Sequence, residues 1–259
     1  MRAFHIKLFL LLNLLSMSLF GCGSLNPSKN GTVPPDHKTF DKLLSKYVDE
    51  EGNVDYQGFL GEKVAFESYL EELKANPPDI NAWTKNDQIA FWINAYNAFT
   101  IQLILNYYPV ESIKDIGTKL QIPFVNTPWD IKFIKIGGEE YDLNNIEHNI
   151  LRKNFDEPRI HFAIVCASFS CPKLRAEAYK GEKLETQLTQ QAKSFLADPN
   201  KNKITQTSVE ISKIFSWFKG DFTKNETLIA FLNRYAQVKI ALDADISYMK
   251  YDWRLNGQE

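Results

Sequence analysis

The stretch that decides the fold is DQIAFWINAYNAFTIQLILNY, residues 87–107. Its apolar side chains occupy nearly every face of a helix, and a helix of this kind is normally buried on most sides. Thr84 and Asp87 stand three residues apart and predict a capping box at its start, while Pro109 predicts its end. We therefore expect a long helix that is buried inside the protein.

The segments on both sides predict shorter helices and a few strands. Apolar residues at helical spacing predict helices over residues 37–48, 64–73, 143–152, 214–218 and 226–235. Alternating residues predict strands over 131–136, 139–143 and 203–211, the first two joined as a hairpin by Gly137-Gly138. Ile160–Cys166 is a continuous apolar run, typical of a strand in the middle of a sheet. Pro172 predicts the start of another helix, which is broken near Gly181 and continues over residues 182–196.

These elements together predict an α+β fold that is rich in helices and has a small, central, mostly antiparallel sheet. Residues 37–259 are enough to bury one large core, and no second linker interrupts them. We therefore expect them to form a single globular domain.

The N-terminal residues have the build of a secretory signal peptide. Arg2 and Lys7 precede an apolar stretch, Leu8–Phe20, which is shorter than the about 20 residues of a membrane-spanning helix. Cys22 follows this stretch in the sequence LFGC, which resembles a bacterial lipobox, where the cysteine carries a diacylglycerol. We expect residues 1–21 to be a signal peptide, Cys22 to be lipidated and residues 22–36 to be a tether.

These features predict a lipid-anchored protein of the cell envelope whose membrane partner is reached through Cys22. Gly23 is not the aspartate that resembles an inner-membrane retention signal, so we expect the outer membrane, facing the periplasm. The formal net charge of −2 gives no electrostatic reason to expect nucleic acid as a partner. An unidentified small molecule or peptide is the expected ligand.

The residues best suited to chemistry lie between Glu147 and Cys171. If a helix begins at Pro172, Cys171 occupies its cap, where free backbone N–H groups and the helix dipole stabilise a thiolate. His148 and His161 are the candidate bases, and Glu147 is a candidate to orient a ring. His148 also has a structural interpretation, as a ring held by a backbone carbonyl. The sequence thus predicts Cys171 as a candidate nucleophile.

The two cysteines of this region have three other interpretations. Outside the cytoplasm Cys166 and Cys171 form a disulfide, or they remain as buried structural thiols. They also have the ligand types of a zinc site when joined with His148 and His161, but the spacing matches no familiar zinc motif. We therefore expect no metal, and we expect no cofactor.

Three further polar residues are candidates for substrate binding. Arg159 is a candidate clamp for a substrate carboxylate, or else it forms an ion pair with Asp156 or Glu157. Asn94 and Asn97 share one face of the long helix. They either line a cleft or, as the residues favour, hydrogen-bond to neighbouring backbone.

Five segments carry a family resemblance: FWINAYNA (91–98), IEH (146–148), RIHFA (159–163), CASFSCP (166–172) and YDWRLN (251–256). In this order they resemble the domain of unknown function 547, over about Val54 to Asn256. The resemblance implies an exported bacterial protein and a distant likeness to papain-like and transglutaminase-like proteins. In those proteins a helix start supplies Cys and a later strand supplies His, whereas here the long helix carries Asn94.

Two hypotheses of function follow from the sequence. The first is a cysteine-hydrolase-like or amide-transfer-like enzyme, with Cys171 as nucleophile, His161 or His148 as base and Arg159 holding a carboxylate. The second is a non-catalytic binding or assembly module of the envelope, in which Cys166 and Cys171 form a disulfide.

Overall fold

The computed structural model describes residues 33–117 and 127–257. The predicted signal peptide, the predicted lipidation site Cys22 and most of the predicted tether lie outside these described residues. Within the described ranges, no helix has both the length and the apolar character needed to cross a membrane.

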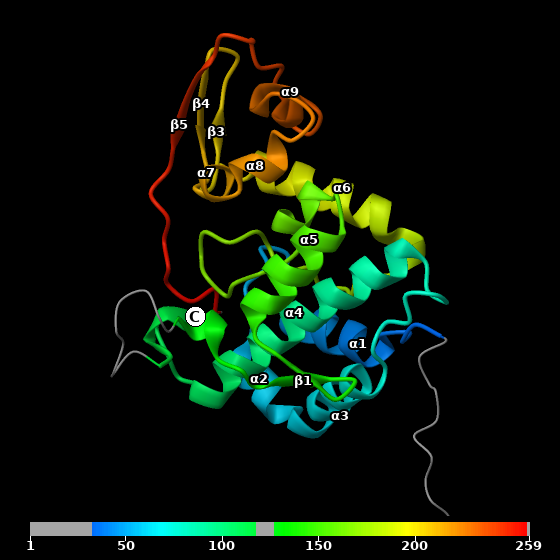
Figure 1. The fold of residues 1–259 in the computed structure, drawn as a ribbon. Coiled ribbons are helices and arrows are strands. Elements are labelled where there is room, and N and C mark those ends of the chain that lie inside the picture. Colours follow the sequence, from blue (N-terminus) through cyan, green and yellow to red (C-terminus); the bar gives the residue numbers. More distant parts are fainter. Residues whose placement is uncertain (1–32, 118–126, 258–259) are drawn as a thin grey trace, which may run out of the picture.

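Helix α4, Lys85–Tyr107, lies at the centre of the larger part of the molecule (Figure 1). It begins with the predicted capping box: the Thr84 hydroxyl accepts a hydrogen bond from the Asp87 N–H, and the Asp87 carboxylate accepts one from the Thr84 N–H. Phe91, Ile93 and Phe99 are fully buried on different faces of the helix. The predicted long, buried helix is therefore confirmed.

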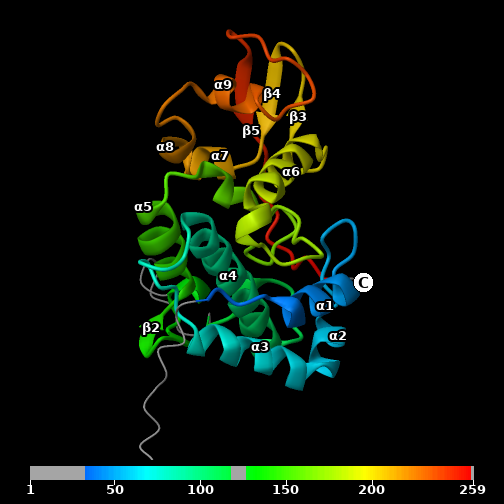
Figure 2. The ribbon, with the colours of Figure 1, turned by 90° about the vertical axis from the view of Figure 1, so that its right-hand side faces the viewer.

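Three helices pack around one another beside α4 (Figure 2). They are α1, Lys38–Tyr47, α2, Tyr56–Gly61, and α3, Lys63–Ala75. Phe40 of α1 stacks on Tyr69 of α3 with 4.7 Å between the ring centroids. The hairpin of β1, Ile134–Ile136, and β2, Glu139–Tyr141, lies against α3 and turns at Gly137 and Gly138, which both have positive φ.

A second, smaller core is built mainly by the C-terminal third of the chain (Figure 1). Its elements are α6, Leu184–Ala197, α7, Ile214–Trp217, α8, Lys219–Phe222, α9, Leu228–Asn233, β3, Lys203–Ile204, β4, Ser208–Ile211, and β5, Asp245–Tyr248. The ring of Phe222 lies 4.9 Å from that of Phe215 and 5.0 Å from that of Phe231. Phe162 joins this cluster, whereas its neighbours Ile160 and Ala163 belong to the larger core. The two cores therefore meet at the segment around Phe162.

The fold is a helix-rich α+β fold, as predicted, but the prediction of one central sheet is wrong. The described strands form two small sheets: the antiparallel pair β1-β2, and a sheet of order β3-β4-β5 in which β3 and β4 are antiparallel and β4 and β5 parallel. The centre of the larger core is occupied by α4, so there is no room for a sheet at that place.

The predicted strand Ile160–Cys166 is also wrong. The segment opens with a 3-10 helix, η5, Pro158–Phe162, which has a proline in its first turn and the Glu157 carboxylate accepting from the Arg159 N–H. The Ala163 N–H then donates to the Ile160 carbonyl at 2.8 Å. A continuous apolar run indicates burial, and it does not by itself distinguish a strand from another buried segment.

The helix predicted to begin at Pro172 does not form; residues 172–180 are irregular, and the next helical turn is η6, Gly181–Lys183, which leads into α6. Side chains satisfy the backbone of this segment, because Asn94 of α4 binds Tyr179 and Asp41 of α1 accepts from the Ala178 N–H at 2.7 Å. Cys171 is therefore not at a helix start, and the predicted stabilisation by a helix dipole does not apply. The predicted helix over residues 182–196 is confirmed as α6.

Candidate functional site

One cleft brings two cysteines, an imidazole ring and a buried carboxyl group together. It has a volume of about 160 Å³, and its lining residues are Tyr96, Trp129, Asn144, Glu147, His161, Ile164, Cys166, Cys171, Pro172, Ile214, Trp217, Phe218, Tyr251 and Trp253. Tyr96 belongs to the larger core and Ile214 to the smaller one. The cleft therefore lies where the two cores meet, a common place for a ligand site.

His161 of η5 is held from two sides. Its Nε2 lies 2.7 Å from Oδ2 of Asp221 in α8, and its ring stacks on Phe218 with 3.9 Å between centroids. A carboxylate only accepts, so Nε2 carries the hydrogen and Nδ1 presents a lone pair. Nδ1 is buried, has no hydrogen-bond partner among the described residues, and lies 3.9 Å from Oε1 of Glu147.

The charge state of His161 follows from burial. Burial lowers the pKa of His161, although the hydrogen bond to Asp221 acts in the opposite direction. Burial alone would raise the pKa of Asp221, but hydrogen bonds from His161 and Arg152 hold it well below its ordinary value. The ring is therefore a neutral imidazole beside an ionised carboxylate, which is the arrangement of a general base with its orienting group.

The two thiols are in direct contact. The Sγ atoms of Cys166 and Cys171 lie 2.6 Å apart, and both residues are free cysteines. The Cys171 sulfur also accepts a hydrogen bond from the Cys166 N–H at 2.9 Å. Burial opposes ionisation of Cys171, but hydrogen bonds from Cys166 and from the Tyr251 hydroxyl outweigh it and lower its pKa to about 6. Hydrogen bonding to Cys171, together with burial, raises the pKa of Cys166, so the pair carries one negative charge on Cys171.

The C-terminal residues hold the loop that carries both thiols. The Phe169 N–H donates to the Arg254 carbonyl at 2.7 Å, and Ser170 is bound to Asp252 through its backbone and its hydroxyl. The Tyr251 hydroxyl lies 3.3 Å from Cys166 Sγ. Ala167, between the thiols, has a φ of 58°, which an alanine adopts only when its surroundings impose it. The contact between the thiols is therefore maintained by residues far along the chain, such as Tyr251, which lies 85 positions after Cys166.

Glu147 supplies the buried carboxyl group of the cleft. It lies in η4, Asn145–Leu151, a π-helical turn within the predicted helix over residues 143–152. Burial raises its pKa to about 7. Arg152 acts in the opposite direction, and nearby Cys171 and Asp221 act in the same direction as burial. Near neutral pH this group therefore exists in both protonation states, as suits a group that gives or takes a proton.

Two of the predicted site residues lie elsewhere. His148 Nδ1 accepts a hydrogen bond from Arg152 at 3.0 Å, and His148 does not line the cleft. The guanidinium of Arg159 is bound by the carboxylates of Glu157 and Glu185, with contacts of 2.6 Å to each. It too lies outside the cleft, so the structure does not bring His148 or Arg159 together with Cys171 there, and the guanidinium of Arg159 is engaged by the ion pairs.

Asn94 and Asn97 bind backbone, which was the favoured alternative for them. The Asn94 amide pairs with both the N–H and the carbonyl of Tyr179. The Asn97 amide donates to the Ala163 carbonyl at 2.9 Å and accepts from the Val165 N–H at 2.8 Å. Neither residue lines the cleft. Asn97 instead fixes the backbone between His161 and Cys166.

The sequence interpretation missed the partners of these groups. Asp221 orients His161, and Arg152, in α5, Arg152–Asn154, binds Asp221 in turn through Nε at 2.6 Å. Nothing near Asp221 in the sequence indicated this role. Tyr251 and Trp253 were noticed only as parts of a terminal motif, although two aromatic residues in a motif outside a regular element are a signal for a binding wall.

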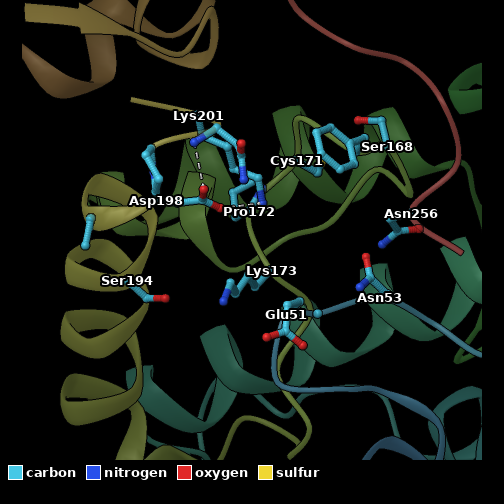
Figure 3. A pocket seen from close by; sticks show the side chains of 15 residues that line it. Glu51, Asn53, Ser168, Cys171, Pro172, Lys173, Ser194, Asp198, Lys201 and Asn256 are labelled. Carbon is cyan, nitrogen blue, oxygen red and sulfur yellow. Dashed lines mark hydrogen bonds and ion pairs between the residues drawn. The ribbon is translucent and has the colours of Figure 1, made fainter. Parts of the chain in front are cut away.

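A second cavity, of about 410 Å³, adjoins the thiol loop, and Cys171 and Pro172 line both cavities. Figure 3 shows its lining of polar and apolar side chains, among which Lys201 is paired with Asp198 at 3.2 Å. Lys173 donates to the Glu50 carbonyl at 3.2 Å. It contains no imidazole among its lining residues. The aromatic cleft is therefore the cavity in which the thiols and a base come together.

Among the described residues, no group of three or more His, Cys, Asp or Glu side chains could hold a metal ion. Comparison with curated proteins and with solved structures gave no match. Residues 80–196 match the sequence model of the family described as "Protein of unknown function, DUF547". This range is narrower than the likeness expected over Val54 to Asn256. Over residues 80–196, which hold Glu147, His161 and both thiols of the cleft, the chain is therefore similar to the proteins of unknown function of the DUF547 family.

Proposed function

We propose that the protein is a cysteine-dependent acyl-transfer enzyme, a hydrolase or amide-transferase, anchored by lipid at the cell envelope. The observation that supports the activity is that one aromatic cleft is lined both by Cys171, whose pKa is lowered, and by His161, whose free Nδ1 lone pair faces no partner among the described residues. Asp221 completes the set by binding the far side of the ring. A nucleophile, a base and an orienting carboxylate are the parts that covalent acyl transfer needs.

In the first half of the proposed reaction, the Cys171 thiolate attacks the carbonyl carbon of an amide or ester, and a C–S bond forms as the C–N or C–O bond breaks. The protonated Glu147 carboxyl group supplies a proton through Nδ1 of His161 to the leaving atom, and Asp221 stabilises the imidazolium in the meantime. In the second half, water or an amine attacks the thioester and gives a proton through His161 to the Glu147 carboxylate. The C–S bond breaks, and the sulfur leaves as the thiolate.

The test uses 4-nitrophenyl acetate as the acyl donor and intact-mass spectrometry as the readout. The wild type should release nitrophenolate and carry one acetyl group, located at Cys171 by peptide mapping. Cys171→Ser should lose the adduct, whereas Cys166→Ser, the matched control in the same loop, should keep it. A wild-type protein that forms no adduct when reduced, or forms it equally after Cys171→Ser, contradicts the proposal.

The location is proposed from the N-terminal sequence, with Cys22 as the lipidated residue and the outer membrane, facing the periplasm, as the place of attachment. Wild type should partition into the detergent phase and Cys22→Ala into the aqueous phase, because acyl chains supply the membrane affinity. Ser24→Ala is the control beside the site and should behave as wild type. Equal partitioning of wild type and Cys22→Ala contradicts lipidation.

A second candidate function is a non-catalytic binding or assembly module, and it is favoured by the 2.6 Å contact between the two sulfurs. In that case the exported protein carries a Cys166–Cys171 disulfide that fixes the loop. The intact mass should then rise by two hydrogen atoms on reduction, and reduced protein should still form no acetyl adduct. An adduct at Cys171 in the reduced protein excludes this candidate.

A further inference from the structure

Aromatic rings form much of the lining of the cleft. Trp253 lies 5.7 Å from Trp129 and 4.6 Å from Tyr251, and Tyr251 lies 4.8 Å from Trp217, with angles of 62°, 52° and 52° between the ring planes. Trp217 and Trp253 in turn are stacked, with 5.9 Å between centroids and 25° between planes, so these rings form one continuous aromatic wall of the cleft. Trp217 is 48% exposed, which leaves one wall open to an entering ligand.

The polar groups of the cleft are neutral donors, such as the Asn144 amide and the indole N–H groups, together with groups that carry negative charge or a lone pair. The latter include the Glu147 carboxyl group, the Cys171 sulfur and the lone pair at Nδ1 of His161. No lysine or arginine is among the residues that line it, in the part of the chain that the structure describes. An anionic ligand would therefore meet negative groups without a counter-charge, whereas a cationic one would be attracted.

Two of the lining rings already bind cations on a face. Lys114 Nζ lies 4.8 Å from the centroid of Trp253, and Arg152 Cζ lies 4.9 Å from that of Phe218. Neither cation lines the cleft. These contacts are of the kind in which the face of an aromatic ring attracts a positive charge.

The unpartnered Nδ1 atom of His161 favours a cation that carries N–H groups. His161 is buried, with 3% exposure, and a buried acceptor without a donor costs free energy that a ligand N–H can recover. A quaternary ammonium group has no N–H to offer. A primary ammonium group has three, and it can also approach Glu147, whose Oε1 lies 3.9 Å from the same nitrogen.

We propose that the aromatic cleft binds a protonated primary amine, such as a lysine side chain or an amino group of the cell envelope, and that this amine is the acyl acceptor. Binding rests on the cleft alone, and the role as acceptor rests on the proposed function. The bound ammonium gives one proton to the Glu147 carboxylate. The neutral amine attacks the thioester carbon, its second proton passes to His161, and the C–S bond breaks as the amide forms and the sulfur leaves as the thiolate.

The binding step is tested on the reduced full chain by tryptophan fluorescence, because three tryptophans line the cleft. The probes share one ring and differ in charge: benzylamine, benzyl alcohol, benzoate and benzyltrimethylammonium. We expect benzylamine to bind about tenfold more tightly than benzyl alcohol or benzoate, and more tightly than the quaternary ion. Benzoate binding equal to that of benzylamine, or no response to benzylamine, overturns the proposal.

Variants locate the site and separate the two proposals. Trp217→Ala and Glu147→Gln should each weaken benzylamine binding about fivefold or more, whereas Tyr107→Ala, at an exposed ring outside the cleft, should not. Cys171→Ser, which removes one negative group of the cleft and leaves its rings and Glu147 in place, should still bind benzylamine, although less tightly than wild type. The acceptor role is read as a benzylamide product from the acetylated enzyme: absence of that product while an acetyl adduct forms overturns the acceptor role alone. Absence of the adduct with benzylamine binding intact overturns the acyl-transfer proposal and leaves the amine site standing.

Discussion

Asp221 accepts a hydrogen bond from His161 at 2.7 Å, although the two residues are 60 positions apart in the sequence. The same oxygen of Asp221 accepts from Arg152 Nε at 2.6 Å. His161 lies in η5, Arg152 in α5 and Asp221 in α8, so one carboxylate joins three separate helical segments. The orientation of the base thus depends on an element of the smaller core.

Removing this carboxylate should change how readily His161 takes a proton. Asp221 raises the pKa of His161, and Arg152 lowers it, so Asp221→Asn should lower that pKa further because the arginine is left without its partner. NMR titration of the imidazole signals measures the change. Asp156→Asn, at an exposed ion pair with Lys224, is the control and should leave the titration unchanged. An unchanged or raised pKa after Asp221→Asn contradicts the assigned pairing.

The reactivity of Cys171 should show its lowered pKa. With a pKa of about 6 the thiolate predominates at neutral pH, so the rate of alkylation by iodoacetamide should already level off near pH 7. An ordinary thiol, with a pKa of about 8.5, is still gaining reactivity there. Peptide mass spectrometry after timed labelling gives the rate at Cys171 alone.

A matched pair of variants tests the cause of that reactivity. Cys166→Ser keeps a hydrogen-bond donor beside the Cys171 sulfur and should keep the early plateau. Cys166→Ala removes the side-chain donor and should move the midpoint to higher pH, because the thiolate loses part of its stabilisation. Identical profiles for the two variants would show that the contact between residues 166 and 171 does not control ionisation.

Glu147 should make stability fall as pH rises. Its pKa is about 7 in the folded protein and 4.5 in the absence of the fold, so the folded state holds the extra proton between these values. The free energy of unfolding contributed by this group is fully present below pH 4.5 and is lost progressively up to about pH 7, a loss on the order of 3 kcal/mol. Glu147→Gln should therefore be close to wild type at about pH 4 and more stable than it at about pH 8. Urea denaturation at both pH values measures the difference, and a variant that is less stable at the higher pH refutes it.

Asn97 should matter for folding rather than for binding. Asn97→Ala leaves the Ala163 carbonyl and the Val165 N–H buried without partners, and we expect a loss of about 3 kcal/mol in the free energy of unfolding. Asn106→Ala, at an exposed position of the same helix, should change stability little. Denaturant titration compares them. Equal stabilities of the two variants contradict the proposed clamp.

The sequence predicted best those elements whose signals are local. The capping box of Thr84 and Asp87 and the apolar faces of α4 lie within a few turns of each other, so residues 84–107 were enough to identify the helix. The Gly137-Gly138 hairpin is local in the same sense. The helix-rich α+β class follows from such elements.

The errors arose where distant side chains decide the backbone. Ile160–Cys166 is apolar because it is buried between the two cores. The side chain of Asn97, which lies 68 positions before Val165, makes the hydrogen bonds that a strand partner would have made. Cys171 and His161 were found because thiols and imidazoles are rare and reactive. Asp221 was missed because an acidic residue on a short surface helix has no pattern that distinguishes it from a solvated one.

The family match ends at residue 196, before Asp221, Trp217, Tyr251 and Trp253. The matched segment thus contains both thiols and the ring, but neither the group that orients the ring nor three of the aromatic walls. A relative that keeps the first part and exchanges the second would retain a sulfur and a base while selecting other molecules. Similarity over this segment alone therefore says nothing about whether two such proteins share a substrate.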